Sequence, residues 1–463
     1  MSIVGGISGS GHSSTSLSFA RWKVLEFDHQ VFLLCLAFYC VLGSTFFWIL
    51  IQYLRLRRRS TAEEARILAL PLPADSGLPN ILVQLPTFNE GTLIRRAAKA
   101  AANLDWPRQL LHVQVLDDST DGSVVHSERA VADLRDQGID ALLLHRPNRD
   151  GFKAGALAGG LLHSDAPYVA ILDVDYLPKP DFLRDCMRAL LDDPRLALAQ
   201  ARCDYLNGDE NLVTGVQQRI LDAHFAVEQA ARSWSGQIVP FNGTCGIWRR
   251  AAIDEAGGWQ GDTLAEDMDL SYRVQLRGWR TLFLASVTVP GELPNTFQNW
   301  RRQQFRWTKG SAEVTRKILA AVWRSPLTLN QKVVSTLHLG GGLFGFVFGL
   351  TFVTGAIDIA WGTGLTGFAL ALILILAAEV IVGPGLLQLV GQKCARGAAI
   401  LPELRRLPLV TVLRLAVGLA NLGGAIEALF GRGTPFVGTP KEGGTSDPVT
   451  AASLSSHVAR PES

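Results

Sequence analysis

The sequence predicts an α/β domain joined to membrane helices, and two observations lead to this. Between Pro79 and Pro290, short apolar runs alternate with amphipathic helical stretches, which is typical of βαβ units in a mostly parallel sheet. Only 19% of the 463 residues are charged while 48% are hydrophobic, and long apolar runs lie outside that region. The balance of 44 Lys and Arg against 42 Asp and Glu argues against a nucleic-acid partner, which usually demands a basic excess.

The first apolar run, residues 31–53, carries no charge and is long enough to cross a hydrocarbon core of about 30 Å. Four arginines between positions 55 and 59 follow it directly. The positive-inside rule therefore places the chain after them in the cytoplasm. We predict an extracytoplasmic tail over 1–29 and a transmembrane helix over 30–54.

Two more transmembrane helices are predicted near the C-terminus, over 333–356 and 364–392. Residues 407–431 are also apolar but include Arg414, and a charge at mid-bilayer costs at least ~2.5 kcal/mol. We interpret this stretch as an interfacial helix, with a fourth span as the alternative. The chain is thus expected to be a multi-pass integral membrane protein, of a bacterial inner membrane or an equivalent, with its α/β domain in the cytoplasm. The Ser-, Gly- and Pro-rich tail, 443–463, is predicted to be disordered.

Within the α/β domain, residues 78–296, acidic side chains follow the predicted strands. The expected strands are 81–85, 112–116, 141–145, 168–172, 196–201 and 281–284, and the expected helices are 90–102, 122–134, 152–162, 179–191 and 209–232. Asp117 and Asp118 follow the second strand, and Asp173 and Asp175 follow the fourth. Ligands bind at the carboxyl ends of parallel strands, so these residues are site candidates. No Gly-rich phosphate loop follows a strand, which argues against a dinucleotide fold.

The pair Asp173 and Asp175 can hold a hard divalent cation, because such ions prefer oxygen ligands and bridge phosphates. By itself an Asp-x-Asp sequence is more often a solvated turn. Here further motifs accompany it in a fixed order along the chain, and they favour a binding site over a solvated turn. The accompanying motifs are Lys153-Ala154-Gly155, Asn242-Gly243-Thr244, Ala265-Glu266-Asp267 and Gln303-Gln304-Phe305-Arg306-Trp307.

With these motifs in this order, the chain resembles the family 2 glycosyltransferases over about residues 81–310. More narrowly, it is similar to the membrane-embedded processive branch: cellulose synthases, hyaluronan synthases and plant cellulose-synthase-like mannan synthases. The resemblance implies a GT-A-type fold that binds a nucleotide sugar and inverts its anomeric configuration. Phe436-Val437-Gly438-Thr439-Pro440-Lys441 resembles the gating loop of cellulose synthases, with Gly438 where that motif has Val. Ala265 stands where the cellulose synthases have Thr.

The resemblance also implies roles for individual residues. The donor, a UDP- or GDP-hexose, would be bound by Asp117, Asp118, Lys153, Asp173, Asp175 and Arg306, with Mg²⁺ or Mn²⁺ on Asp173 and Asp175. Asp267, beside Glu266, would be the general base. The acceptor would contact Gln303, Trp307, Asn242, Gly243 and Thr244, within reach of interfacial helices over 297–330. A gating loop over 432–442 would contribute Phe436, Thr439 and Lys441.

Three functions remain open at this point. A processive synthase would extend a β-linked polysaccharide from UDP-glucose or GDP-mannose. A glycolipid synthase of the ceramide or diacylglycerol type would add one or a few hexoses to a lipid acceptor. A non-catalytic membrane subunit is disfavoured, because it would be expected to carry broken acidic motifs. The lipid bilayer is an expected partner in each case, and homo-oligomers or accessory subunits are left open.

Overall fold

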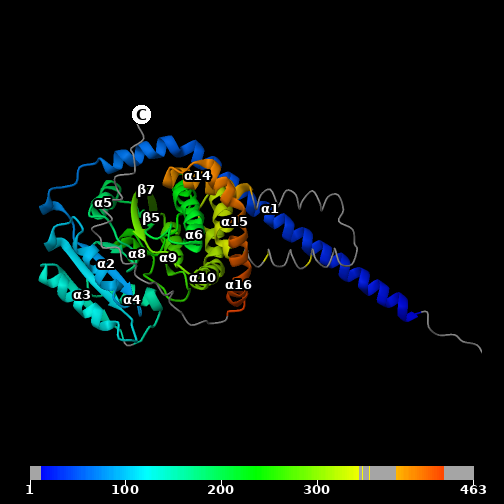
Figure 1. Cartoon of the computed structure of the whole chain (residues 1–463), viewed down its shortest axis with the longest axis horizontal. Coiled ribbons are helices and arrows are strands. Elements are labelled where there is room, and N and C mark those ends of the chain that lie inside the picture. The colour runs from blue at the N-terminus through cyan, green and yellow to red at the C-terminus, as the bar shows by residue number, and fades with distance from the viewer. Residues whose placement is uncertain (1–11, 147, 344–346, 348–353, 355–381, 432–463) are drawn as a thin grey trace, which may run out of the picture.

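The structure, a computed structural model, describes residues 12–146, 148–343, 347, 354 and 382–431. Seven strands form one sheet. They are β1 (Ile81–Thr87), β2 (Leu111–Asp117), β3 (Asp140–His145), β4 (Tyr168–Ile171), β5 (Leu196–Tyr205), β6 (Gly246–Arg249) and β7 (Arg280–Gly291). Their order is β3-β2-β1-β4-β6-β5-β7. The neighbouring strands β5 and β7 are labelled in Figure 1. The predicted α/β fold with a mostly parallel sheet is confirmed, because only β6 runs antiparallel to its neighbours. β6 was not among the expected strands, because its residues, Gly246–Arg249, include only two large apolar side chains and form no apolar run.

Helices cover both faces of this sheet. The helices on one face are α2 (Leu93–Ala102), α3 (Val124–Asp136) and α5 (Phe182–Asp192), and those on the other are α4 (Phe152–Leu161), α8 (Arg250–Glu255) and α9 (Glu266–Leu276). Successive strand residues point to opposite faces, so in β1 Val83 packs in the first core and Leu82 in the second. Short 3₁₀ turns lie at Asp75–Gly77 and Arg108–Leu110. This layering leaves the carboxyl edge of the parallel strands open for a site.

A 57-residue helix, α1 (His12–Leu68), contains the predicted first transmembrane segment. Its N-terminal half stands clear of the α/β domain, while its C-terminal end lies along the domain (Figure 1). There the Glu64 carboxylate accepts hydrogen bonds from the backbone N–H groups of Ser286 (2.7 Å) and Ala285 (3.1 Å) in β7. The end of α1 is therefore fixed to the sheet.

The predicted second and third spans lie mostly outside the described residues, as do the gating-loop segment and the C-terminal tail. The second begins in α11 (Leu329–Leu339), which a 3₁₀ turn, η4 (Gly340–Leu343), follows, and the third ends in α14 (Gly383–Arg396). In the part of the chain that the structure describes, one helical stretch, residues 400–428, is long and apolar enough to cross a membrane. The number of membrane spans stays a prediction.

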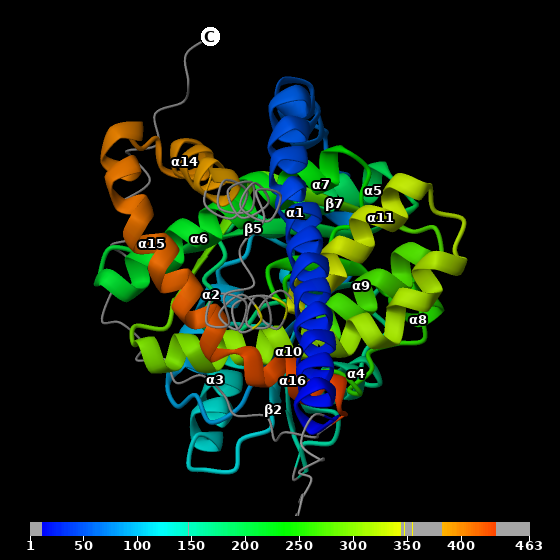
Figure 2. The same cartoon turned by 90° about the vertical axis from the view of Figure 1, so that its right-hand side faces the viewer.

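That stretch consists of α15 (Ile400–Ala420) and α16 (Leu422–Leu429), which run from α14 to α10 (Phe297–Arg324) along one side of the domain (Figure 2). Val410 and Val417 are buried against Trp300 of α10 and Val216 of α6 (Leu212–Ala223). Further apolar side chains of α15 are exposed: Leu401, Leu404, Leu409 and Val412. One side of α15 thus packs on the domain while apolar side chains remain uncovered, as an interfacial helix requires.

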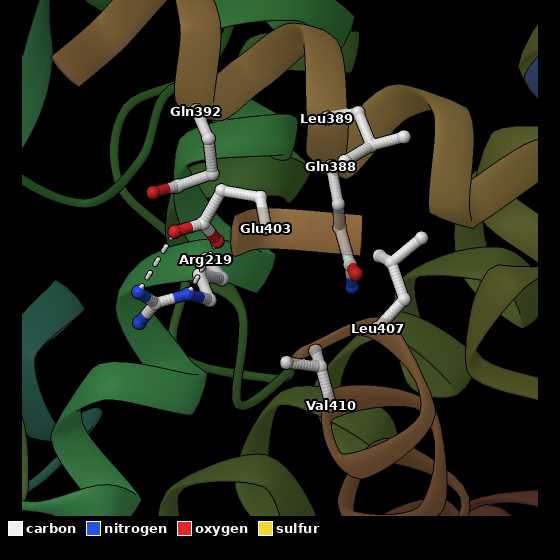
Figure 3. A pocket seen from close by; sticks show the side chains of 7 residues that line it. All are labelled: Arg219, Gln388, Leu389, Gln392, Glu403, Leu407 and Val410. Atoms are coloured by element: carbon white, nitrogen blue, oxygen red, sulfur yellow. Dashed lines mark hydrogen bonds and ion pairs between the residues drawn. The ribbon is translucent and has the colours of Figure 1, made fainter. Parts of the chain in front are cut away.

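An ion pair anchors the start of α15. Arg219 of α6 donates to both carboxylate oxygens of Glu403, from Nε at 2.7 Å and from Nη2 at 3.2 Å, beside a small hollow between α6, α14 and α15 (Figure 3). Arg406 also donates to Glu403. Burial disfavours the charged carboxylate, yet the two guanidinium groups hold the pKa of Glu403 below its ordinary value.

We expect Glu403→Ala to lower the free energy of unfolding by about 3 kcal/mol, because it leaves Arg219 without its partner in a buried setting. The measurement is thermal unfolding of the purified full chain in detergent. The matched control is Glu63→Ala, whose 2.8 Å pair with Arg66 joins half-exposed side chains, so its loss should change stability little. Equal shifts in melting temperature for the two variants would contradict the anchoring role.

Candidate active site

The carboxyl ends of β2 and β3 carry the first predicted donor residues. Both carboxylate oxygens of Asp118 accept from Arg146, Oδ1 from Nε at 2.7 Å and Oδ2 from Nη2 at 2.6 Å, and the Asp118 side chain is buried. Asp117 Oδ1 instead accepts from the backbone N–H of Ser119 at 2.7 Å, which is an Asx-turn. The sequence analysis missed Arg146 as the partner of Asp118, because a bidentate pair between separate strands leaves no local signal.

The end of β4 carries the second acidic pair. Lys153, at the start of α4, donates from Nζ to Asp173 Oδ1 at 2.5 Å and to the backbone oxygen of Gly243 at 2.9 Å. The backbone N–H of Asp173 donates to Thr244 Oγ1 at 2.9 Å. Three predicted site segments that are far apart in the sequence are therefore joined by one ammonium group and one hydroxyl.

The donor set of Asp173 and Asp175 fits a divalent cation that is shared with a diphosphate. Mg²⁺-type ions are usually held by one or two carboxylates together with phosphate oxygens and water. Among the described residues, no group of three His, Cys, Asp or Glu side chains converges to form a closed metal cage. Asp175 is nearly buried and Asp173 is only partly covered, so this strand end offers two carboxylates and leaves the remaining ligands to the substrate.

The loop before β6 brings the predicted acceptor residues next to the predicted base. Gly243 has φ of 78°, a backbone conformation that favours glycine. A methyl group added there would lie 2.9 Å from Asp267 Oδ2 and 3.7 Å from Lys153 Nζ. Any side chain at position 243 would therefore crowd the Asp267 carboxylate and the Lys153 ammonium group.

Glu266 and Asp267 form the first turn of α9. Burial, reinforced by the charge of Asp267, raises the pKa of Glu266 to about 7, and Lys153 opposes this shift. Burial likewise raises the pKa of Asp267 to about 6, although the backbone N–H of Met268 and the Lys153 ammonium act to lower it. Lys153 itself is disfavoured as a cation by burial, but the neighbouring carboxylates raise its pKa above the ordinary value. The pair of acids is thus tuned toward neutral pH, as general acid–base groups need.

Helix α10 completes the site from the predicted interfacial segment. Burial lowers the pKa of Arg306, while Glu266, Glu90 and Asp173 act against that shift, which places its guanidinium among the acidic side chains. Gln303 is partly buried and Trp307 is 47% exposed, so the indole is available to a ligand. Phe436, Thr439 and Lys441, predicted for a gating loop, lie outside the described residues.

A close contact between helices sets the position of the acids. A methyl group added at Gly310 of α10 would lie 2.9 Å from the backbone of Leu264 and Ala265, directly before Glu266. Lys317 of α10 also pairs with the buried Asp269 of α9 at 2.9 Å. The sequence analysis did not single out Gly310 or Lys317, although a glycine three residues after Trp307 was visible as a signal for close approach.

The mostly parallel sheet, covered by helices on both faces, is a GT-A-like α/β fold, and acidic side chains and Lys153 gather at its strand ends. Comparison with known proteins bears on this directly. The family described as "Glycosyl transferase family group 2" matches residues 168–382. Residues 168–382 are therefore similar to the family 2 glycosyltransferases, and the resemblance that the motifs indicated is confirmed.

Curated relatives define the branch of that family. The chain is 46% identical over 271 residues to glucomannan 4-beta-mannosyltransferase 2 of Arabidopsis thaliana, covering 57% of this chain and 50% of that protein. It is 40% identical over 293 residues to glucomannan 4-beta-mannosyltransferase 1 of Oryza sativa subsp. japonica, covering 61% of this chain and 56% of that protein. The chain thus spans about half the length of these relatives.

A solved structure supports the fold. A mannosyltransferase from Pyrobaculum calidifontis, determined in complex with GDP-Man and Mn²⁺, superimposes with a TM-score of 0.54 at 22% identity. The match covers 86% of this chain and 100% of that one. At this identity the likeness concerns the GT-A-like architecture.

We expect Gly310→Ala to destabilise the protein by about 1–3 kcal/mol, because the added methyl group would press on backbone before Glu266. Thermal unfolding of the full chain measures this. Gly418→Ala is the matched control: Gly418 lies inside helix α15 with nothing within 4 Å of an added methyl group, so alanine there should stabilise by about 0.5–1 kcal/mol. Shifts of the same sign in both variants would contradict the packing argument.

Proposed function

We propose that this chain is an inverting, metal-dependent membrane glycosyltransferase that transfers mannose from GDP-mannose to a growing β-linked glycan. The observation that carries the proposal is the convergence of Lys153, Asp173 and Asp267 around Gly243, where no side chain intrudes. The names of the curated relatives favour mannose over glucose. UDP-glucose remains the alternative donor, and a glycolipid the alternative product.

In the proposed reaction Asp267 removes the proton of an acceptor hydroxyl as that oxygen attacks the anomeric carbon. The bond from that carbon to the diphosphate breaks on the opposite side, so an α-linked donor yields a β-linkage. Lys153 and Arg306 are the cations placed to offset the negative charge of the departing diphosphate. Asp173 and Asp175 would hold Mg²⁺ or Mn²⁺, which neutralises further diphosphate charge when bound.

The acceptor is proposed to lie along Asn242, Gln303 and Trp307. Sugar rings present C–H groups that pack on aromatic faces, and Trp307 offers an accessible indole beside Arg306. Processive extension would keep the product in contact with these residues between additions. The uncovered apolar side chains of α15 and the apolar segment of α1 support a location at the membrane surface, with the product directed toward the predicted spans.

The test is a donor screen on membranes that contain the full chain, scoring nucleotide release and product size. We expect GDP-mannose with Mn²⁺ to give the fastest release and a polymer that resists organic extraction. Asp267→Asn should lose at least 10³-fold in turnover, in the range of general base removal. Exclusive turnover of UDP-glucose would overturn the donor, an organic-soluble product would overturn the polymer, and wild-type turnover by Asp267→Asn would overturn the base.

The pH profile provides a second prediction. Because Asp267 must be ionised to act as base and its pKa is raised to about 6, turnover should fall about tenfold per pH unit below pH 6. The raised pKa also means that the ionised carboxylate destabilises the fold near neutral pH and that acidification relieves this cost. Asp267→Asn should therefore melt no lower than the wild type at pH 7.5. A flat profile between pH 4.5 and 7.5 would contradict the assignment.

A further inference from the structure

A π-helical turn, η3 (His224–Gln229), separates α6 from α7 (Ala230–Trp234) and contacts Asn242 in the loop before β6. In an α-helix, residues five apart point about 140° away from each other. The π-turn closes hydrogen bonds from i to i+5 and so brings both Glu228 and Gln229 onto His224. Their distances are 2.9 Å from His224 Nδ1 to Glu228 Oε2 and 3.5 Å from His224 Nε2 to Gln229 Nε2.

The partners of this turn define the orientation of the Gln229 side-chain amide. Burial works against the charge of Glu228, yet His224 and Arg232 hold the pKa of its carboxyl well below the ordinary value. Gln229 faces the other ring nitrogen of His224, Nε2, with its Nε2 amino group and not with its carbonyl oxygen.

The same Gln229 Nε2 donates to Asn242 Oδ1 at 2.8 Å. This bond consumes the acceptor end of the Asn242 amide and leaves its donor end, Nδ2, turned away. Asn242 Nδ2 is a buried atom with no hydrogen-bond partner among the described residues. A buried donor without a partner is costly, and such atoms are commonly satisfied by a ligand or by water.

The backbone around Asn242 is braced at the centre of the site. Gln200 Oε1 accepts from the backbone N–H of Asn242 at 3.2 Å, and Lys153 donates to the backbone oxygen of Gly243. Gly243 lies next to Asp267, because a methyl group added at Gly243 would be 2.9 Å from Asp267 Oδ2. Asn242 therefore directly precedes the residue that lies against the proposed base.

We propose that Gln229 is a positioning residue that orients the Asn242 amide so that Nδ2 donates to a hydroxyl oxygen of the acceptor sugar. The inference rests on the proposed function and deepens it, because it assigns part of the acceptor subsite. The hydroxyl oxygen accepts this hydrogen bond from Nδ2 while another hydroxyl of the same sugar delivers its proton to Asp267. Asn242 recognises the acceptor directly, and Gln229 acts through it.

The experiment uses the purified full chain in detergent with β-1,4-mannohexaose as acceptor probe. Gln229→Leu, and the isosteric Gln229→Glu that cannot donate, should each raise the KM and the calorimetric Kd for mannohexaose about tenfold. The KM for the nucleotide sugar and nucleotide release to water should stay unchanged. Asn242→Ala should show the same acceptor defect, and Asn242→Ala combined with Gln229→Leu should be no worse than Asn242→Ala alone.

Gln217→Leu is the matched control. Gln217 is a buried glutamine of α6 whose Nε2 donates to the backbone oxygens of Pro294 (2.7 Å) and Val213 (3.1 Å), so its loss costs stability without touching the Asn242 amide. It should lower the melting temperature and leave the affinity for mannohexaose at the wild-type value.

The outcomes separate the inference from the proposed function. Three results would overturn the positioning role of Gln229 and leave the proposed glycosyltransferase function untouched. They are wild-type affinity for mannohexaose in Gln229→Leu, additive defects in the double variant, and an equal loss of affinity for the donor. Failure of the wild type to bind mannohexaose would overturn it as well. A wild type that binds mannohexaose through Gln229 and Asn242 but turns over no nucleotide sugar would overturn the proposed function alone.

Discussion

The ammonium group of Lys153 is the contact on which the arrangement of the site depends. It joins Asp173 at the end of β4 to the carbonyl of Gly243 before β6. It also opposes the rise in pKa of Glu266 and Asp267. Without this cation, three carboxylates would face one another in a partly buried space, and their repulsion would favour protonation or separation. The same charge that holds the acids together is placed to meet a diphosphate.

Packing around α9 explains how the acids are presented. Gly310 lets α10 approach the backbone directly before Glu266, and Lys317 pairs with Asp269 one turn into the helix. The helix that carries Arg306 and Trp307 is thus docked on the helix that carries Asp267, the proposed base. A shift of α10 would move the acceptor residues and the base together, which couples the segment predicted to lie at the membrane to the chemistry.

The sequence predicted much of the α/β domain, because amphipathic periodicity and strand-end acids are local signals. Six of the seven strands were expected, and the family resemblance was confirmed by comparison. β6 was missed because Gly246–Arg249 contains no apolar run, and its antiparallel pairing interrupts the βαβ pattern. Arg146 and Gln229 were not assigned roles, since each acts through a partner from another element, Asp118 and Asn242. The roles of the predicted site residues stay proposals until the variants are measured.

The sequence alone determined which side chains are available: paired aspartates after two strands, a lysine opening a helix, and an acidic pair before an apolar helical stretch. These features depend only on residue type and spacing, which the amino-acid sequence itself specifies. Only the tertiary structure decided which of them meet. Lys153 reaches both Asp173 and Gly243, and the π-turn places Gln229 on Asn242, because sheet order and helix packing bring distant segments together. Burial at that meeting point, a property of no single segment, is what moves the pKa of Asp267 toward neutrality.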